Sequence, residues 1–488
     1  MQKVIHEEAR DIPVLDEVDV LVAGGGVAGC AAAVSAARAG ARTMLLERNG
    51  CLGGVATATL MANIGNRFLT ASGRQVLEGF AGELVERLVK IGAASSRWHH
   101  RDVPGVVMDS ERLKVVLVEM ADESGVTVLT HALAARPIME GNAVRGAFFE
   151  SKSGRQAVLA KATVDATGEA DLAYQAGARC LFEPGSASIL FKLANVDLDE
   201  FVAFLRQDPE GFPAGMDYVR DLDTFERNWK ERGIFFFPHG GGRKWRFLQQ
   251  AIERGELKKE IGPAFSLDAF GLYGLSGTGC VVVNSNFYRI ADLDVRNLSG
   301  FELHAQRMCY YVAEFMRRHI PGFSRAIVAH VGVDLGIRVS RYIEGRSTLD
   351  SESVNSAPGP VLSDDVIGTF PVLDSGPGKQ GFFRDYTCDI PFGIMVPVGC
   401  DGLLVASGKS VSTSRPAILR GMTGCMICGE AAGVASALAA RKGIRSADVP
   451  IRELQSELLR QKVHLGCPER LRALGLVQVE TQLHLHGE

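Results

Sequence analysis

The hydrophobic pattern of the first fifty residues predicts a strand, a helix and a second strand. Val20 to Val22 form a short apolar run, typical of a buried parallel strand. Residues 30–38 are small and mostly apolar, which favours a closely packed helix that ends at Gly40. Residues 42–46 predict the second strand. This unit explains the uncharged stretch 20–37 better than a membrane-spanning helix does.

Later patterns predict further elements of an α/β protein. Residues 109–124 predict a helix and residues 126–129 a strand, while residues 144–150 open a hairpin. Residues 301–319 show the spacing of an amphipathic helix. Residues 403–407 predict a last buried strand, and a helix is expected to start around Thr423 to Cys425.

Composition then limits the class of protein. The 488 residues suggest two or three domains, and 53 basic against 57 acidic side chains give a net charge of −4. This balance, with 7% aromatic residues, argues against a dedicated nucleic-acid or anionic-membrane binder. The ten scattered cysteines predict reduced thiols in a cytoplasmic protein. The N-terminus carries acids and no long apolar core, so no signal peptide is expected.

Three glycines follow the first strand at the spacing of a dinucleotide-binding turn. Gly24 permits the tight turn, Gly26 lets a pyrophosphate approach the backbone, and Gly29 lets helix and strand pack closely. Glu47 ends the second strand 18 residues later, where a carboxylate can accept a hydrogen bond from a ribose hydroxyl. A second match, residues 376–381, has no strand before it and is interpreted as a loop, so no separate nicotinamide domain is expected.

Four further segments carry a family resemblance: residues 48–57, 162–171, 401–409 and 420–433. Together with the first glycine turn they resemble the FAD-dependent oxidoreductases of the glutathione-reductase-like fold, whose relatives include fumarate reductase and succinate dehydrogenase flavoproteins. The likeness extends from Val18 to about Ala440. It implies a Rossmann-like FAD-binding domain with an inserted α+β substrate domain.

The resemblance also implies the domain boundaries and the cofactor residues. The FAD-binding domain takes residues 17–182 and 385–440, the inserted substrate domain 183–384, and a helical tail 441–488. The residues expected to bind FAD are Gly24, Gly26, Gly29, Glu47, Arg48, Gly53, Gly54, Thr167, Gly168, Gly408, Thr423, Gly424 and Cys425. The helix that starts near Thr423 is expected to point its N-terminus at the flavin, where its dipole favours negative charge.

Four residues are candidates for chemistry on the substrate. Arg338 and Arg341 lie three residues apart and would share one face if the segment is helical. They could then clamp a carboxylate or another oxygen-rich group, or they could form structural ion pairs. His239, on a glycine loop, could donate a proton or be a surface residue. Tyr386 could relay a proton or be a packed aromatic. Two residues depart from the family pattern: Val339 stands where the family often has an acid, and Lys409 stands where it often has an arginine.

Cysteine and histidine pairs offer weaker alternatives. Cys425 and Cys428 could form a redox dithiol or be small buried helix residues, and Cys51 could anchor the flavin covalently. The pairs His99/His100 and His484/His486 lack further ligands, so no metal is expected.

The sequence therefore predicts an FAD-dependent oxidoreductase that transfers a hydride between a small organic substrate and flavin N5. The electron acceptor, the direction of reaction and a homo-oligomeric state stay open, and no nucleic acid or membrane span is expected. Two alternatives are an electron-transfer subunit of a larger complex and a thiazole-synthase-like protein that uses its dinucleotide as ligand or precursor.

Overall fold

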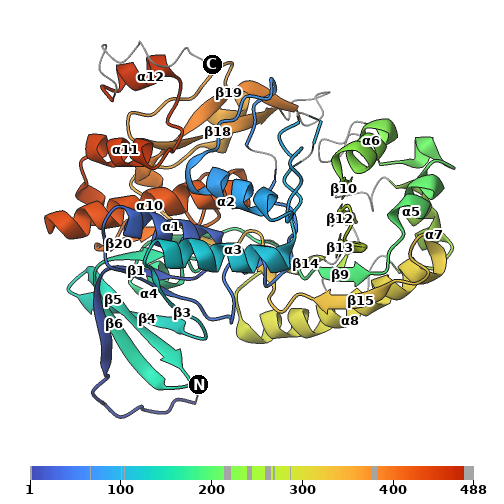
Figure 1. Ribbon diagram of the computed structural model, residues 1–488. Coiled ribbons are helices and arrows are strands. Elements are labelled where there is room, and N and C mark those ends of the chain that lie inside the picture. Colours follow the sequence, from blue (N-terminus) through green and yellow to red (C-terminus); the bar gives the residue numbers. More distant parts are fainter. Residues whose placement is uncertain are drawn as a thin grey trace.

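The computed structural model forms two lobes, of which the inserted one lies on the right in Figure 1. It describes residues 3–476 apart from 66–67, 101, 104, 214–220, 239–244, 259–264, 267–269, 286 and 375–381. The predicted site residue His239 and the second glycine match at 376–381 lie outside these described residues.

The larger lobe is built on a seven-stranded sheet whose parallel part confirms the predicted α/β fold. Its strand order is β3-β2-β1-β6-β5-β4, and β20 pairs with β6. The parallel strands are β3 (Thr127–Leu129), β2 (Thr43–Leu46), β1 (Val14–Ala23), β6 (Gly154–Asp165) and β20 (Leu403–Val405). β4 (Leu133–Glu140) and β5 (Ala143–Ser151) continue from β6 as an antiparallel meander. β1 begins six residues before the predicted Val20, because Val14 to Val18 also pair with β6.

The helices of this lobe are α1 (Val27–Arg38), α2 (Gly79–Lys90), α3 (Ser110–Glu123), α4 (Asp171–Gln175), α9 (Ser351–Ser356), α10 (Met422–Lys442), α11 (Ile451–Arg460) and α12 (Pro468–Ala473). The α3 prediction is confirmed, and the side chain of Asp109 caps that helix by accepting a hydrogen bond from the Glu111 N–H at 2.9 Å. Within the described residues, α10 alone is long and apolar enough to cross a membrane, and its apolar window is entirely buried inside the protein. This burial is that of a core helix.

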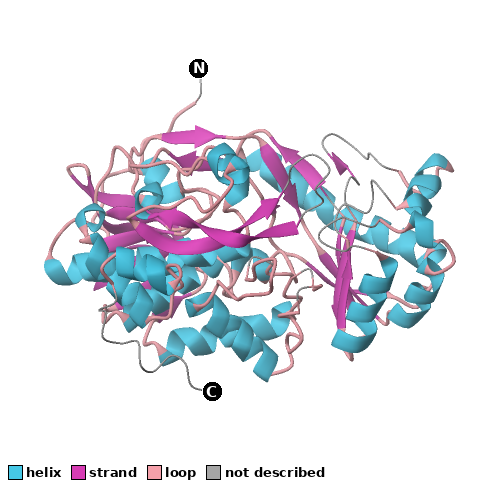
Figure 2. Cartoon of the chain, turned by 90° about the horizontal axis from the view of Figure 1, so that it is seen from above, coloured by secondary structure: helices cyan, strands magenta, loops and turns pink. Residues whose placement is uncertain are grey.

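The inserted lobe contains a five-stranded antiparallel sheet of β10 (Ile234–Phe237), β12 (Gly271–Leu275), β13 (Cys280–Asn284), β9 (Phe191–Ala194) and β15 (Ile327–Val331). Its helices are α5 (Leu198–Leu205), α6 (Leu222–Arg232), α7 (Arg246–Glu253) and α8 (Val295–His319). Figure 2 shows helices on the outer side of this sheet, and α6 also reaches the larger lobe, where the Asn228 side-chain amide donates to the carbonyl oxygen of Asp102 at 2.8 Å. α8 begins six residues before the prediction, because Asp294 caps it.

Three smaller sheets complete the fold of the described residues. One contains β11 (Phe265–Ser266), β14 (Phe287–Ile290), β8 (Gly185–Ser188) and β16 (Gly336–Ile337). The strands β7 (Cys180–Phe182) and β17 (Arg341–Ile343) form a second pair, and β18 (Val366–Asp374) and β19 (Phe382–Pro391) form a third.

Helices α1 and α10 contact each other through their backbones. A Cβ on Gly429 would overlap the carbonyl oxygen of Ala28, and a Cβ on Gly433 would overlap that of Ala32. Every residue of α1 from Val27 to Ala36 is buried between α10 and the sheet. Small residues in both helices therefore set how closely α10 can lie over the parallel strands.

We expect Gly433→Ala to lower the free energy of unfolding by about 2–3 kcal/mol, although alanine favours helices, because the methyl group has no space. The matched control is Gly300→Ala in α8, where nothing lies within 4 Å of the added Cβ. That control should raise the free energy of unfolding by about 0.5–1 kcal/mol. Urea unfolding checks both, and an equally stable Gly433→Ala would contradict the packing argument.

A buried carboxylate on α10 caps another helix. The Phe80 N–H donates to the two carboxylate oxygens of Glu430 at 3.2 and 3.3 Å, at the first turn of α2. Burial raises the pKa of Glu430 to about 8, against an ordinary value of 4.5. Because the folded state holds this proton more tightly than the unfolded chain does, the contribution of Glu430 to stability falls as pH rises from 4.5 to 8.

We expect Glu430→Gln to remove this pH dependence, because glutamine can still accept from the Phe80 N–H. The variant should resemble the wild type near pH 4.5 and exceed its free energy of unfolding by about 2–4 kcal/mol at pH 8.5. Denaturation curves at four pH values measure this difference. A constant difference between the two proteins across the pH range would show that Glu430 does not titrate there.

Candidate functional site

The predicted motif of Gly24, Gly26 and Gly29, at the turn between β1 and α1, leaves free space at one of these glycines. Gly24 has a φ of +100°, and a Cβ there would lie 2.5 Å from the carbonyl oxygen of Ala166. A Cβ on Gly29 would overlap the carbonyl oxygen of Gly24. By contrast, a Cβ on Gly26 would meet nothing within 4 Å. Since Gly26 is the N-cap of α1 and the first turn of α1 holds no acid, this space suits an anionic group such as a pyrophosphate.

The acid at the end of β2 lies against the glycine turn. Glu47 is 4% exposed, and its carboxylate accepts hydrogen bonds from the N–H groups of Gly25 at 2.6 Å and Asn49 at 2.7 Å. Burial raises its pKa, although both backbone bonds act in the opposite direction. The carboxylate is thus held in one orientation beside the turn, as ribose recognition requires.

The two glycines after β2 pack on the same turn. The Gly53 N–H donates to the carbonyl oxygen of Gly25 at 2.8 Å, and a Cβ on Gly54 would lie 2.9 Å from the Cα of Gly26. Cys51 is partly exposed nearby, with its sulfur 3.9 Å from the hydroxyl oxygen of Thr57. The structure therefore brings residues 51–54 to the free space at Gly26.

A buried aspartate that sequence reasoning did not single out shapes the turn after β6. Asp165 accepts from the Thr167 N–H at 3.1 Å, the Thr167 hydroxyl at 2.6 Å and the Ala173 N–H at 2.8 Å. Burial raises its pKa. Its position directly before Thr167 and Gly168 was the available signal, since an acid that ends a buried strand seldom stays unpaired.

The loop after β20 and the start of α10 converge on one carbonyl group. A Cβ on either Gly408 or Gly424 would overlap the carbonyl oxygen of Leu419. This close approach places Thr423 and Cys425, both buried in the first turn of α10, next to the end of β20. The Cys425 sulfur lies 3.8 Å from the hydroxyl oxygen of Ser407.

Burial raises the pKa of both thiols of the C-x-x-C pair, Cys425 and Cys428. A thiol that holds its proton is a poor nucleophile in disulfide exchange, and both side chains are free thiols in the structure. The environment of these cysteines therefore favours their structural interpretation over the redox one.

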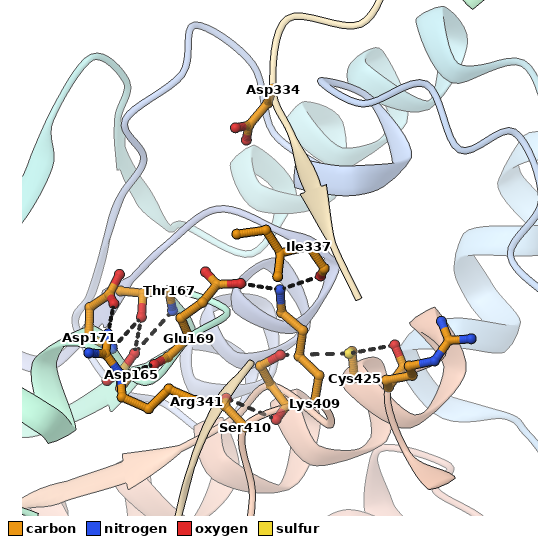
Figure 3. A network of polar contacts seen from close by, with 12 residues as sticks. Asp165, Thr167, Glu169, Asp171, Asp334, Ile337, Arg341, Lys409, Ser410 and Cys425 are labelled. Carbon is orange, nitrogen blue, oxygen red and sulfur yellow. Dashed lines mark hydrogen bonds and ion pairs between the residues drawn. The ribbon is translucent and has the colours of Figure 1, made fainter. Parts of the chain in front are cut away.

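A charged network joins three loops at the carboxyl ends of the parallel strands (Figure 3). The Lys409 ammonium forms an ion pair with Glu169 and donates to the carbonyl oxygen of Ile337 at 2.8 Å. The guanidinium of Arg341 pairs with Asp171 and donates to the carbonyl oxygen of Glu169 at 2.8 Å. Burial, followed by repulsion from the neighbouring acids Glu169 and Asp165, raises the pKa of Asp171 to about 6.

The two candidate arginines do not share a helix face. Ile337 ends β16 and Arg341 begins β17, so the segment between them is extended, which contradicts the helical spacing assumed for the clamp. Arg341 pairs with Asp171 and lies over the Tyr174 ring at 4.2 Å, whereas Arg338 lies over the Phe287 ring at 4.3 Å. The two arginines therefore contact different residues and do not form the predicted clamp on one helix face.

Two further predicted residues, Tyr386 and Arg48, already have protein partners. The Tyr386 hydroxyl, on β19, donates to the carbonyl oxygen of Ala357 at 2.8 Å and also contacts Arg384, so its proton is already engaged. Arg48 forms a two-oxygen ion pair with Asp334 at 2.6 Å. Within the described part of the chain, no group of three His, Cys, Asp or Glu side chains could hold a metal.

Comparison with known proteins identifies the family. The model of the FAD dependent oxidoreductase family matches residues 19–458. The chain is 30% identical over 229 residues to digeranylgeranylglycerophospholipid reductase 2 of Methanothermobacter thermautotrophicus, which is 44% of this chain and 59% of the relative. It is 28% identical over 206 residues to digeranylgeranylglycerophospholipid reductase 1 of Methanopyrus kandleri, or 42% and 54% of the two chains. The chain thus matches less than two thirds of the length of either relative.

Solved structures with a similar fold are more distant in sequence. A geranylgeranyl bacteriochlorophyll reductase-like protein from Thermoplasma acidophilum has a TM-score of 0.43 at 15% identity, covering 92% of this chain and 84% of its own. The p-nitrophenol 4-monooxygenase of Pseudomonas putida has a TM-score of 0.42 at 11% identity, covering 95% and 93%. Because both TM-scores are low, the assignment rests on the family match, which spans most of the sequence. The glycine turn, the buried acid beside it and the βαβ unit fit a dinucleotide. The chain belongs to the FAD-dependent oxidoreductase family, and its cofactor is FAD.

Proposed function

We propose that this protein transfers a hydride between a small organic substrate and N5 of its bound FAD. The observation that carries the proposal is the free space at Gly26, which lies between the N-terminus of α1, the fixed carboxylate of Glu47 and the Gly53–Gly54 turn. When bound, FAD supplies the two-electron chemistry that no side chain offers. The chain's own residues hold the cofactor, orient the substrate and exclude water.

The inner face of the inserted sheet is the surface proposed to receive the substrate. Strand pairing puts Phe236, Tyr273 and Val282 on the same face as Lys192 and His330. That face is turned toward the larger lobe, because Lys192 lies 3.8 Å from Asp109 and His330 lies 3.2 Å from Glu111. The opposite face packs on α5 through Phe235 and Phe237.

The centre of this inner face is apolar, which suits a hydrophobic substrate. Phe236, Tyr273 and Val282 form one buried cluster with Leu60 and Ala62 of the larger lobe. The curated relatives are named as reductases of an isoprenoid lipid. Both observations support reduction of a carbon–carbon double bond in an apolar substrate as the reaction to test first.

The reaction also needs a partner that exchanges electrons with the flavin. We propose that electrons are exchanged with a separate donor or acceptor, such as oxygen, a quinone or another protein. The ten free cysteines support a reducing, cytoplasmic location. A homo-oligomer is also proposed, and sedimentation of the purified protein measures it directly.

We expect Gly26→Val to abolish FAD binding without unfolding the protein. Gly26 has a φ of −65°, which valine adopts, and the added side chain would fill the space offered to the pyrophosphate. Purified wild-type protein should be yellow and release FAD on denaturation, while the variant should be colourless with an unchanged melting temperature of the cofactor-free form. Gly300→Ala should remain yellow. A yellow Gly26→Val protein would contradict this site.

We expect the reduced protein to be reoxidised by an isoprenoid that carries allylic double bonds. The protein is reduced anaerobically, mixed with geranylgeraniol, and followed by flavin absorbance, with mass spectrometry of the product. A mass increase of two hydrogens is the expected result. Saturated phytanol is the matched control ligand. Reoxidation by neither isoprenoid, but by a quinone alone, would favour an electron-transfer role.

A further inference from the structure

Residues 332–341 run from β15 back to the larger lobe and cross the carboxyl edge of its parallel sheet. Two contacts fix the start of this segment: the Val333 N–H donates to the carbonyl oxygen of Ala58 at 2.7 Å, and the Thr59 hydroxyl donates to the carbonyl oxygen of Asp334 at 2.9 Å. Figure 3 shows the chain passing from Asp334 to Ile337 above the charged network.

Three charged contacts tie this segment to the ends of three different strands. Arg48, after β2, pairs with Asp334 at 2.6 Å. Lys409, after β20, donates to the carbonyl oxygen of Ile337 at 2.8 Å. Arg341 reaches the turn after β6, where it pairs with Asp171 and donates to the carbonyl oxygen of Glu169. In open parallel sheets, this edge is where ligands bind.

The apolar side chains of the segment belong to the other lobe. Leu335 and Ile337 pack with the core cluster of the inserted domain. When the polar ties of the segment to the FAD-binding edge break, Leu335 and Ile337 therefore keep their apolar contacts with the inserted domain.

We propose that residues 332–341 form a strap that gates the exchange of FAD, with Lys409 as its principal tie. Lys409 and Glu169 are 13% and 17% exposed, so water and salt screen their attraction weakly. The Arg48 side chain is 57% exposed, so its pair with Asp334 contributes less. Lys409 also covers Gly168, where a Cβ would lie 3.2 Å from the Lys409 Cε.

A gate and a direct contact have different kinetic signatures. A tie that only holds the strap closed slows entry and exit of FAD equally, because it raises the barrier between the two states. A side chain that instead binds FAD directly slows exit alone. The association and dissociation rate constants of FAD therefore separate the two roles.

We expect Lys409→Met to raise both rate constants about 10- to 100-fold, while the dissociation constant changes by less than about threefold. Dissociation is measured on the holoenzyme by exchange with labelled FAD, and association by flavin fluorescence after the cofactor has been removed. Lys409→Arg keeps the cation but not the compact geometry of the ammonium, so both rate constants should lie between those of the wild type and Lys409→Met. Lys230→Met, which removes a lysine from an ion pair with Glu226 on the outer helix α6, is the matched control and should leave both rates unchanged.

Asp334→Asn opens the strap from its other end and tests the proposal if Lys409→Met fails to fold. It should raise both rate constants about two- to fivefold, and less at 1 M salt, where the exposed pair is already screened. If the association rate constant of FAD is unchanged in the variants, or if they exchange FAD at the wild-type rates, the proposal of a strap is wrong. The proposed function would be unaffected by that result. A wild-type protein that takes up no FAD overturns both.

Discussion

Backbone contact between α1 and α10 is the constraint on which the larger lobe depends. Gly429 and Gly433 allow α10 to lie on the carbonyl groups of Ala28 and Ala32, with no side chain between the helices. Because α1 also packs on the strands, this short separation brings the start of α10 to the same sheet edge as the glycine turn. This one contact therefore brings together the glycine turn and the start of α10, which are far apart in the chain.

Buried carboxylates recur around that assembly, and backbone N–H groups hold each of them. Glu47 accepts from the glycine turn, Asp165 from its own turn and from α4, and Glu430 from the first turn of α2. Burial raises the pKa of all three. Because the donors belong to the backbone, each acid fixes the position of the chain segment that it binds: the glycine turn, the turn after β6 and the start of α2.

The segment that returns from the inserted domain is held at the carboxyl edge of the parallel sheet by polar contacts, whereas Leu60 and Ala62 of the larger lobe join the apolar core of the inserted domain. Lys409 lies between Glu169 and the carbonyl oxygen of Ile337 in the returning segment, and Arg341, at the end of that segment, pairs with Asp171. The departure from the family pattern at Lys409 therefore affects the contact between lobes. A lysine gives a point charge that one carboxylate and one carbonyl satisfy, whereas an arginine would need a planar arrangement of acceptors.

Local features of the sequence determined the βαβ unit, the glycine turn, the caps at Asp109 and the family, because each depends on residues close together in the chain. Whether Arg338 and Arg341 share a helix face could not be predicted from local sequence. Both ends of this segment are strands because β16 pairs with β8 and β17 pairs with β7, which lie far away in the chain. The roles of Glu430 and Lys409 were also hidden, because their partners Phe80 and Glu169 lie 350 and 240 residues away in the chain. Only the tertiary structure decides which charges meet, since burial and pairing depend on distance in space.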